Sequence, residues 1–168
     1  MSLFQNIVII LVLIAGAGFL SLTEIALAGA RKVKLKILAE SGEDRAQKVL
    51  NLQENSADFF AASQIGLNAV AILGGILGEG AFRPYFMSFV SRFYTGPWSE
   101  TISFALSFTL VTSLFILFAD LMPKRLAMIA PEKISIAVIN PIQVFIKVCK
   151  PLAWIINALA NLLFRLFK

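Results

Sequence analysis

Two carboxylates stand within apolar stretches of the sequence. Asp120 closes the third long apolar run, and Glu24 lies in the second half of the first. A charge at the centre of a bilayer costs on the order of 3 kcal/mol, so such residues usually face the protein interior or water and mark an ion pathway. Both are therefore candidate cation ligands. Alternatively, Asp120 could be a solvated helix end paired with Lys124, and Glu24 could reach the interface beside Arg31.

Pro123 gives the surroundings of Asp120 a second distinctive property. Proline lacks an N–H and disfavours helical geometry at the preceding residue, Met122. We therefore expect the helix to end or bend here and to leave carbonyl oxygens unpaired close to the carboxylate. Carboxylate and carbonyl oxygens are the ligands that hard cations such as Mg²⁺ prefer.

Neutral polar residues accompany the carboxylates on the predicted helices. Ser21 and Glu24 are three residues apart and Gln64 and Asn68 are four apart, so the members of each pair share a helix face. Ser21, Asn68 and Asp120 come from three helices, and a shared internal point would give each a polar partner. Asn68 could instead bond a neighbouring helix, and a serine or threonine its own backbone. Further candidates for the substrate or its pathway are Glu24, Thr23, Gln64 and Ser113, the last lying seven residues before Asp120.

The composition is that of a membrane protein. Hydrophobic residues make up 58% of the 168 residues, charged residues only 15%, and the mean hydropathy is +0.82. A chain of this kind cannot cover itself with polar surface. Of the 15 basic residues, only Arg83 and Arg92 lie outside two blocks, 31–48 and 124–168. Positive residues favour the cytoplasmic side, which predicts three crossings with the N-terminus outside and the C-terminus cytoplasmic. The net charge of +5 then reflects topology, and nucleic acid is not an expected partner.

The apolar pattern predicts an all-α fold with crossings at about 3–30, 59–77 and 101–122. Between the first two, residues 31–58 have the spacing of two short amphipathic helices separated at Ser41-Gly42. Glycines 74, 75, 78 and 80 are expected to loosen the end of the second helix, so that 79–100 forms an outer loop. Residues 131–168 are interrupted by Pro141 and Pro151 and predict a belt of amphipathic helices at the inner interface instead of a fourth crossing.

Several kinds of chemistry are excluded or disfavoured by the composition. The chain has no histidine, which removes imidazole metal sites and histidine acid–base catalysis. Its single cysteine, Cys149, cannot form an intrachain disulfide. No pairing of a nucleophile with a base is evident, so the protein is not expected to be an enzyme. The first helix lacks a basic N-terminal flank and is expected to be retained in the membrane.

Three stretches resemble the signature sequences of the transmembrane (DUF21) domain of the CorC/CNNM family. They are 19–27 (FLSLTEIAL), 64–68 (QIGLN) and 120–124 (DLMPK). The match extends over essentially the whole chain, so residues 1–168 are expected to form a single membrane domain. The resemblance implies a homodimer in the bacterial inner membrane, with three membrane helices and an inner juxtamembrane belt per subunit. It also implies cytosolic CBS-pair and CorC-type domains in the full-length protein.

The resemblance further implies a ligand set for Mg²⁺ as the transported ion. Carried over by motif, the ligands are the side chains of Ser21, Asn68 and Asp120, with Gly66 as a backbone contributor. The family usually has glutamate at the position of Asp120 and often glycine at that of Ala119. The shorter carboxylate of this chain would enlarge the site.

Three functions remain open at this point. The first is efflux of Mg²⁺ or another divalent cation through a dehydrated site of oxygen ligands. The second is export of a polyamine such as putrescine or cadaverine, for which Asp120 and Glu24 are the obvious pair of anionic groups. The third is a membrane regulator that senses a cation without transporting it. Measurements of cation and polyamine flux distinguish these functions.

Overall fold

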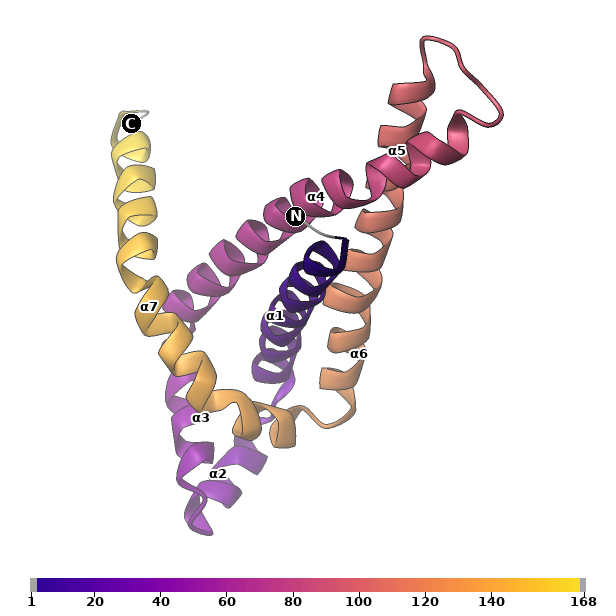
Figure 1. Ribbon diagram of the computed structural model, residues 1–168. Coiled ribbons are helices and arrows are strands. Elements are labelled where there is room, and N and C mark those ends of the chain that lie inside the picture. The colour runs from indigo at the N-terminus through magenta and orange to yellow at the C-terminus, as the bar shows by residue number, and fades with distance from the viewer. Residues whose placement is uncertain (1–2, 167–168) are drawn as a thin grey trace. The chain divides into compact units, whose positions relative to one another are not determined.

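The predicted all-helical architecture is confirmed in the computed structural model, which describes the backbone of residues 3–166 and the side chains of 4–152, 154 and 155. Over that range every element is helical (Figure 1). The elements are α1 (Leu3–Gly29), α2 (Lys32–Glu40), α3 (Asp44–Glu54), α4 (Ser56–Val90), α5 (Ser99–Phe115), the π-helical segment η1 (Ile116–Leu121), α6 (Met122–Ile129) and α7 (Pro131–Leu166).

Four stretches of helix in the described range are long and apolar enough to cross a membrane. They are Phe4–Gly29, Ser56–Val90, Ser99–Ile129 and Pro131–Leu152. The first three contain the three predicted crossings. The fourth falls in the segment that we expected to lie along the inner interface, so length and hydropathy alone do not separate α7 from the other three.

The helices form two compact units. The first unit comprises residues 1–19 and 67–123, and the second comprises residues 20–66 and 124–168. Because α1 and α4 each contain a boundary between the units, each of these helices contributes residues to both.

In the first unit, α4 is much longer than the sequence indicated. It continues through all four glycines and through Pro84 to Val90, so the prediction of an outer loop over 79–100 was wrong and the loop is limited to 91–98. Two of the glycines serve packing. A Cβ atom at Gly74 would collide with the ring of Phe115, and one at Gly78 would collide with Val111. These glycines therefore let α5 approach α4 closely, and the helix does not end at them.

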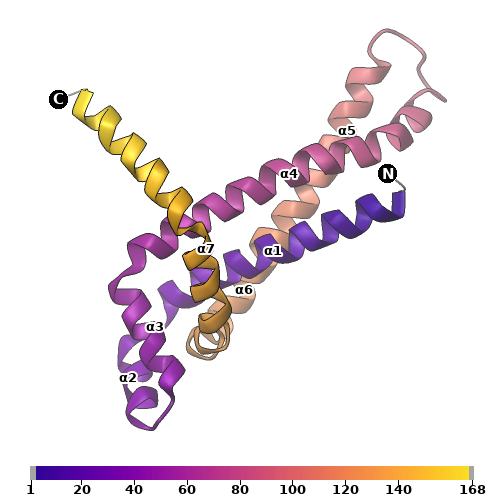
Figure 2. The same cartoon turned by 60° about the vertical axis from the view of Figure 1, so that its left-hand side comes forward.

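In the second unit, α2 and α3 form a short helical hairpin, as predicted for 31–58 (Figure 2). Gly42 lies in the turn with a φ of +97°, a conformation that residues with a Cβ rarely adopt. Leu35 of α2 and Val49 of α3 are fully buried, whereas Val33 is largely exposed. The hairpin thus has a buried seam and an apolar outer residue suited to a membrane surface.

Helix α7 packs against α3 and is continuous over its described length. We had expected Pro141 and Pro151 to break this segment into several helices, and that expectation was wrong. Each proline removes one backbone hydrogen bond and crowds the carbonyl four residues earlier, but the fully buried side chains of Ile139 and Ile142 anchor the helix around the first of them. Figure 1 shows α7 changing direction along its length without interruption.

Candidate functional site: polar residues of the membrane helices

The predicted site residues are distributed over both units. The second unit contains Ser21, Thr23, Glu24, Gln64 and Gly66, and the first contains Asn68, Ser113 and Asp120. Within the second unit the structure brings Glu24 and Gln64 together. Each of the other site residues is described below by its surroundings within its own unit.

The C-terminal half of α1 carries a buried polar face. Ser21 and Thr23 are fully buried, and both have interaction partners. Glu24 is half-buried, and its Oε1 accepts a long hydrogen bond of 3.4 Å from Nε2 of Gln64 on α4. Among the described side chains no cation pairs with Glu24. Its negative charge is therefore held beside a neutral amide and is not neutralised by a salt bridge.

Ser63 and Gly66 lie in the part of α4 that belongs to the second unit. A Cβ atom at Gly66 would lie 2.7 Å from Cδ1 of Leu20 and 2.7 Å from Cζ of Phe145, so its small size lets α1 and α7 approach α4. Ser63 is fully buried, and its Oγ has no hydrogen-bond partner in the described part of the chain. The sequence analysis missed Ser63, although a hydroxyl directly before Gln64 was a signal that could have found it.

Asp120 lies in a π-helical segment of the first unit. The chain does not end its helix at Pro123, as we considered, but widens into η1 directly before it. The N–H of Met122 bonds to the carbonyl of Leu117, five residues back, and Pro123 has no N–H to donate. The loss of regular α geometry beside the carboxylate thus takes the form of a π segment, a feature often found at functional sites, and the unpaired carbonyl oxygens stay a prediction. Asp120 is half-buried and has an interaction partner.

Gly18 of α1 packs directly on this irregular turn. A Cβ atom at Gly18 would lie 3.2 Å from Cγ of Pro123 and 3.4 Å from the carbonyl oxygen of Phe118. The absence of a side chain at Gly18 therefore lets α1 approach this turn closely. At Gly16, by contrast, a Cβ atom would meet nothing within 4 Å.

Asn68 and Ser113 are exposed polar side chains inside candidate spans. Neither side chain forms a hydrogen bond within the described part of the chain. The seven-residue spacing that placed Ser113 on the face of Asp120 assumed a regular α-helix, but the chain enters the wider turns of η1 at Ile116, before it reaches Asp120. The spacing therefore no longer places these two residues on one face.

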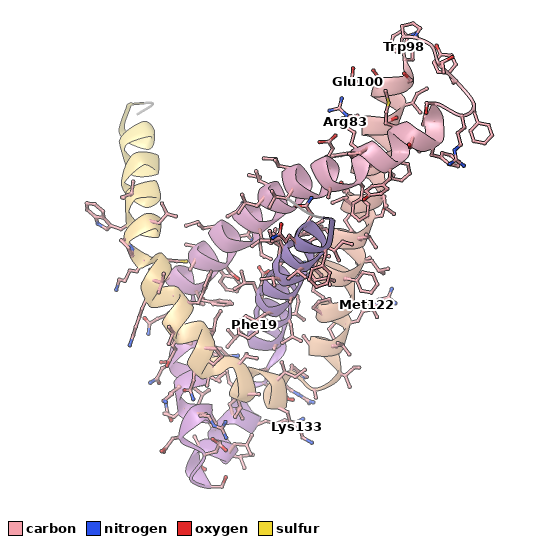
Figure 3. The ribbon with its side chains drawn as sticks, viewed as in Figure 1. Phe19, Arg83, Trp98, Glu100, Met122 and Lys133 are labelled. Atoms are coloured by element: carbon pink, nitrogen blue, oxygen red, sulfur yellow. The ribbon has the colours of Figure 1, made fainter. Side chains whose placement is uncertain are left out.

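A charged network in the first unit was not anticipated. Nη2 of Arg83 lies 2.6 Å from Oε1 of Glu100 at the start of α5 (Figure 3). Its Nε lies 3.6 Å from Oε1 of Glu79, one turn earlier on α4. Glu79 has 18% of its side chain exposed, and its Oε1 is buried without a hydrogen-bond partner among the described residues. Glu79 and Arg83 are four residues apart, a spacing that predicts an ion pair on a helix. The sequence analysis missed this pair because it expected a loop at these residues.

Comparison with known proteins connects these features to a family. The family model for the Cyclin M transmembrane N-terminal domain, CNNM, matches residues 8–168. The chain belongs to this family. Its resemblance to the CorC/CNNM membrane domain is thereby confirmed.

The CNNM domain has relatives among curated proteins. The polyamine export protein of Escherichia coli K12 is 55% identical over 166 residues, which cover 99% of this chain and 37% of that protein. The polyamine export protein of Haemophilus influenzae is 44% identical over 168 residues, covering 100% of this chain and 39% of that protein. The UPF0053 protein YhdT of Bacillus subtilis is 29% identical over 164 residues, covering 97% and 36%. The chain thus spans little more than a third of the length of these relatives, two of which are named as transporters.

Proposed function

We propose that this CNNM domain is the membrane domain of a polyamine exporter. The observation that carries the proposal is its 55% identity, over 99% of its length, to a polyamine export protein. Export of a divalent metal, which we placed first from the sequence, becomes the second candidate. The two cargoes share a positive charge and differ in how that charge is distributed.

The chemistry of a diamine fits the two carboxylates. Putrescine and cadaverine carry an ammonium group at each end of an apolar chain, so a site for them needs two separate anionic or carbonyl-lined ends. We propose Glu24 of the second unit and Asp120 of the first, each considered within its own unit, as the anionic groups that recognise ammonium groups of the cargo. Glu24 supports this role because its described partner is the amide of Gln64 and not a cation.

Mg²⁺ efflux remains a candidate because of the surroundings of Asp120. Pro123 withholds a donor from the carbonyls of the preceding turn, and those oxygens together with the carboxylate are suitable for a hard cation. In this alternative the ligands are Ser21, Asn68 and Asp120, with the backbone of Gly66. A cation-sensing regulator without flux would use the same residues.

Flux measurements test the proposal directly. Proteoliposomes containing the protein are expected to transport radiolabelled putrescine above the level of protein-free liposomes, and unlabelled cadaverine should compete. Magnesium flux is measured in parallel with a fluorescent indicator. Transport of Mg²⁺ without putrescine would contradict the proposal in favour of the metal, and stabilisation by either cargo without flux would favour the sensor.

We further propose three crossings, with the N-terminus outside and α7 along the inner interface. Three contacts in the first turns of α7 support this arrangement. Glu132 binds Arg31 and Lys34 at 3.3 and 3.4 Å, and Asn140 accepts a hydrogen bond from Lys48 at 3.2 Å. The first turns of α7 therefore lie beside the charged α2–α3 hairpin.

Cysteine labelling distinguishes three crossings from four. In a Cys149→Ser background, Glu40→Cys, Lys133→Cys and Trp154→Cys are expected to react with an impermeant reagent from the cytoplasmic side, and Phe93→Cys from the outer side. All four positions are exposed. If α7 crosses the bilayer, Trp154→Cys is labelled from the side opposite to Lys133→Cys.

The assembly that we propose is a homodimer in the bacterial inner membrane, associated with the cytosolic CBS-pair domain of the full-length protein. Two features support contact with a second copy. Gly16 and Gly75 face open space, and the amide of Asn68 has no hydrogen bond in the described part of its own chain. Small residues and amides of this kind mediate helix association in membranes.

A further inference from the structure

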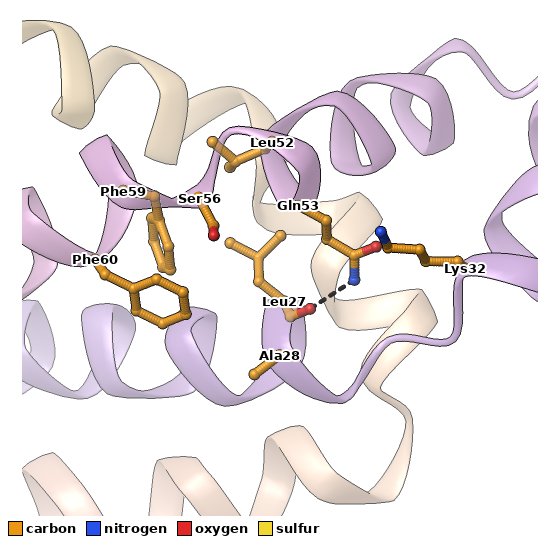
Figure 4. Close-up of a pocket in the computed structure, with 8 residues that line it drawn as sticks. All are labelled: Leu27, Ala28, Lys32, Leu52, Gln53, Ser56, Phe59 and Phe60. Atoms are coloured by element: carbon orange, nitrogen blue, oxygen red, sulfur yellow. Dashed lines mark hydrogen bonds between the residues drawn. The ribbon is translucent and has the colours of Figure 1, made fainter.

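A pocket of about 220 Å³ lies within the second unit, where α1 and α3 end and α4 begins (Figure 4). Leu27, Phe59 and Phe60 form an apolar wall, and Lys32 and Gln53 form a polar edge. The pocket shares no residue with the predicted cation pathway. Its ligand must therefore be inferred from its own chemistry.

The pocket lies where two candidate spans end. Leu27 is close to the end of the span Phe4–Gly29, and Ser56 is the first residue of the span Ser56–Val90. Lys32 follows the first span by three residues. The apolar wall is therefore level with the part of the acyl chains next to the headgroups, and the polar edge is level with the headgroups themselves.

Gln53 presents an unsatisfied acceptor at this edge. Its Nε2 donates to the carbonyl oxygens of Leu27 and Ala30, at 2.7 and 2.9 Å, which lie at the C-terminal end of α1 and lack helical partners. These two bonds fix the orientation of the amide. Its Oε1 is then turned away from the carbonyls, buried, and without a hydrogen-bond partner in the described part of the chain. A ligand with an N–H or O–H would remove the cost of that unpaired acceptor.

Lys32 has a positive charge that is not already paired with a carboxylate of the described side chains. Arg31 and Lys34 both bind Glu132, whereas Lys32 forms no ion pair among the described side chains. Figure 4 shows its amine at the same edge of the pocket as the oxygen of Gln53. The two side chains together offer a positive charge and a hydrogen-bond acceptor. They suit an anionic ligand that also carries a hydrogen-bond donor.

We propose that this pocket binds the headgroup of a membrane phospholipid. The phosphate binds Lys32, and an N–H or O–H of the headgroup donates to Oε1 of Gln53. Pockets that enclose a whole drug-sized molecule measure about 300–1,000 Å³, so this smaller one suits a headgroup whose chains remain outside. The chains leave along Phe60, whose side chain is 37% exposed.

The donor is tested by changing the lipid, because a substitution of Gln53 would also remove its bonds to α1. Phosphatidylethanolamine and phosphatidylcholine with the same acyl chains share the phosphate, but only the former has N–H donors. In titrations followed by native mass spectrometry, we expect phosphatidylethanolamine to bind about tenfold more tightly, since a charge-assisted hydrogen bond is stronger than a neutral one. Equal affinities would overturn the proposal.

The phosphate contact is tested by a matched pair of variants. Lys32→Gln is expected to weaken the binding of both lipids about fivefold, a loss typical of an accessible ion pair. Lys36→Gln makes the same change on the same helix outside the pocket and should leave both affinities unchanged. Equal losses in the two variants would indicate general surface attraction and reject the site. Displacement of the lipid by an equal concentration of soluble glycerophosphoethanolamine would identify a free phosphate ester as the ligand and reject the lipid.

Discussion

Asp120→Asn is expected to lower putrescine export at least about thirtyfold, because removing one partner of a desolvated charge pair costs about 2–5 kcal/mol. The substitution removes the negative charge and changes little else. The half-buried carboxylate lies in the π segment that precedes Pro123, so its loss would leave an ammonium group with only neutral oxygens there. The initial rate in proteoliposomes, at putrescine concentrations above and below the wild-type KM, measures the effect.

Asp58→Asn is the matched control for Asp120→Asn. Asp58 is exposed in the first turn of α4, and the same chemical change there should leave the rate unchanged. Light scattering with the detergent mass subtracted should give the mass of two chains for both variants, which separates a loss of transport from a loss of assembly. Wild-type rates in Asp120→Asn would show that this carboxylate does not bind the cargo.

Glu24→Gln is expected to separate the two cargoes. If Glu24 binds one end of a diamine, its neutralisation should lower putrescine export at least about tenfold, since hydrogen bonds to charged groups contribute about 1.5–3 kcal/mol. The Mg²⁺ ligand set implied by the family does not include Glu24, so stabilisation of the protein by Mg²⁺ should be unchanged. Glutamine can still bond Gln64, which preserves the link between α1 and α4.

A monoamine makes the test of Glu24 sharper. Butylamine has the length of putrescine but only one ammonium group, so the wild-type protein should prefer putrescine and Glu24→Gln should lose much of that preference. Glu54→Gln, an exposed change on α3, serves as the control. A preference for putrescine that persists in Glu24→Gln would exclude Glu24 as a ligand for the second ammonium group.

The helical fold and the α2–α3 hairpin could be predicted because hydrophobic spacing depends on local sequence. The length of α4 could not. Glycine is a poor helix former in isolation, but Gly74 and Gly78 are held in the helix by the side chains of Phe115 and Val111, which are distant in sequence. The same is true of α7, where the buried Ile139 and Ile142 outweigh the local effect of Pro141.

The candidate site was predictable in its residue types and less so in its geometry. Asp120 beside Pro123 and Glu24 within an apolar run are visible as chemical exceptions in the sequence. The pairing of Glu24 with Gln64 depends on how α1 and α4 pack, and no spacing within one helix reports it. The prediction that Ser113 and Asp120 share a helix face was wrong because it assumed regular α-helical turns throughout, and η1 has wider turns.

The π segment is also a defect whose position along its helix is fixed. In principle, a wide turn can move along a helix when its hydrogen bonds change from a spacing of five residues to one of four. Each side chain that the turn passes would then rotate about the helix axis by about 100°. Pro123 prevents this exchange here. If the wide turn moved toward Ser113, the ring of Pro123 would meet the carbonyl of Ala119 in a regular α turn, at a cost of about 3 kcal/mol. The distortion around Asp120 is consequently fixed in its place along the helix, and under the proposed function any change of access to Asp120 would come from movements of whole helices around it.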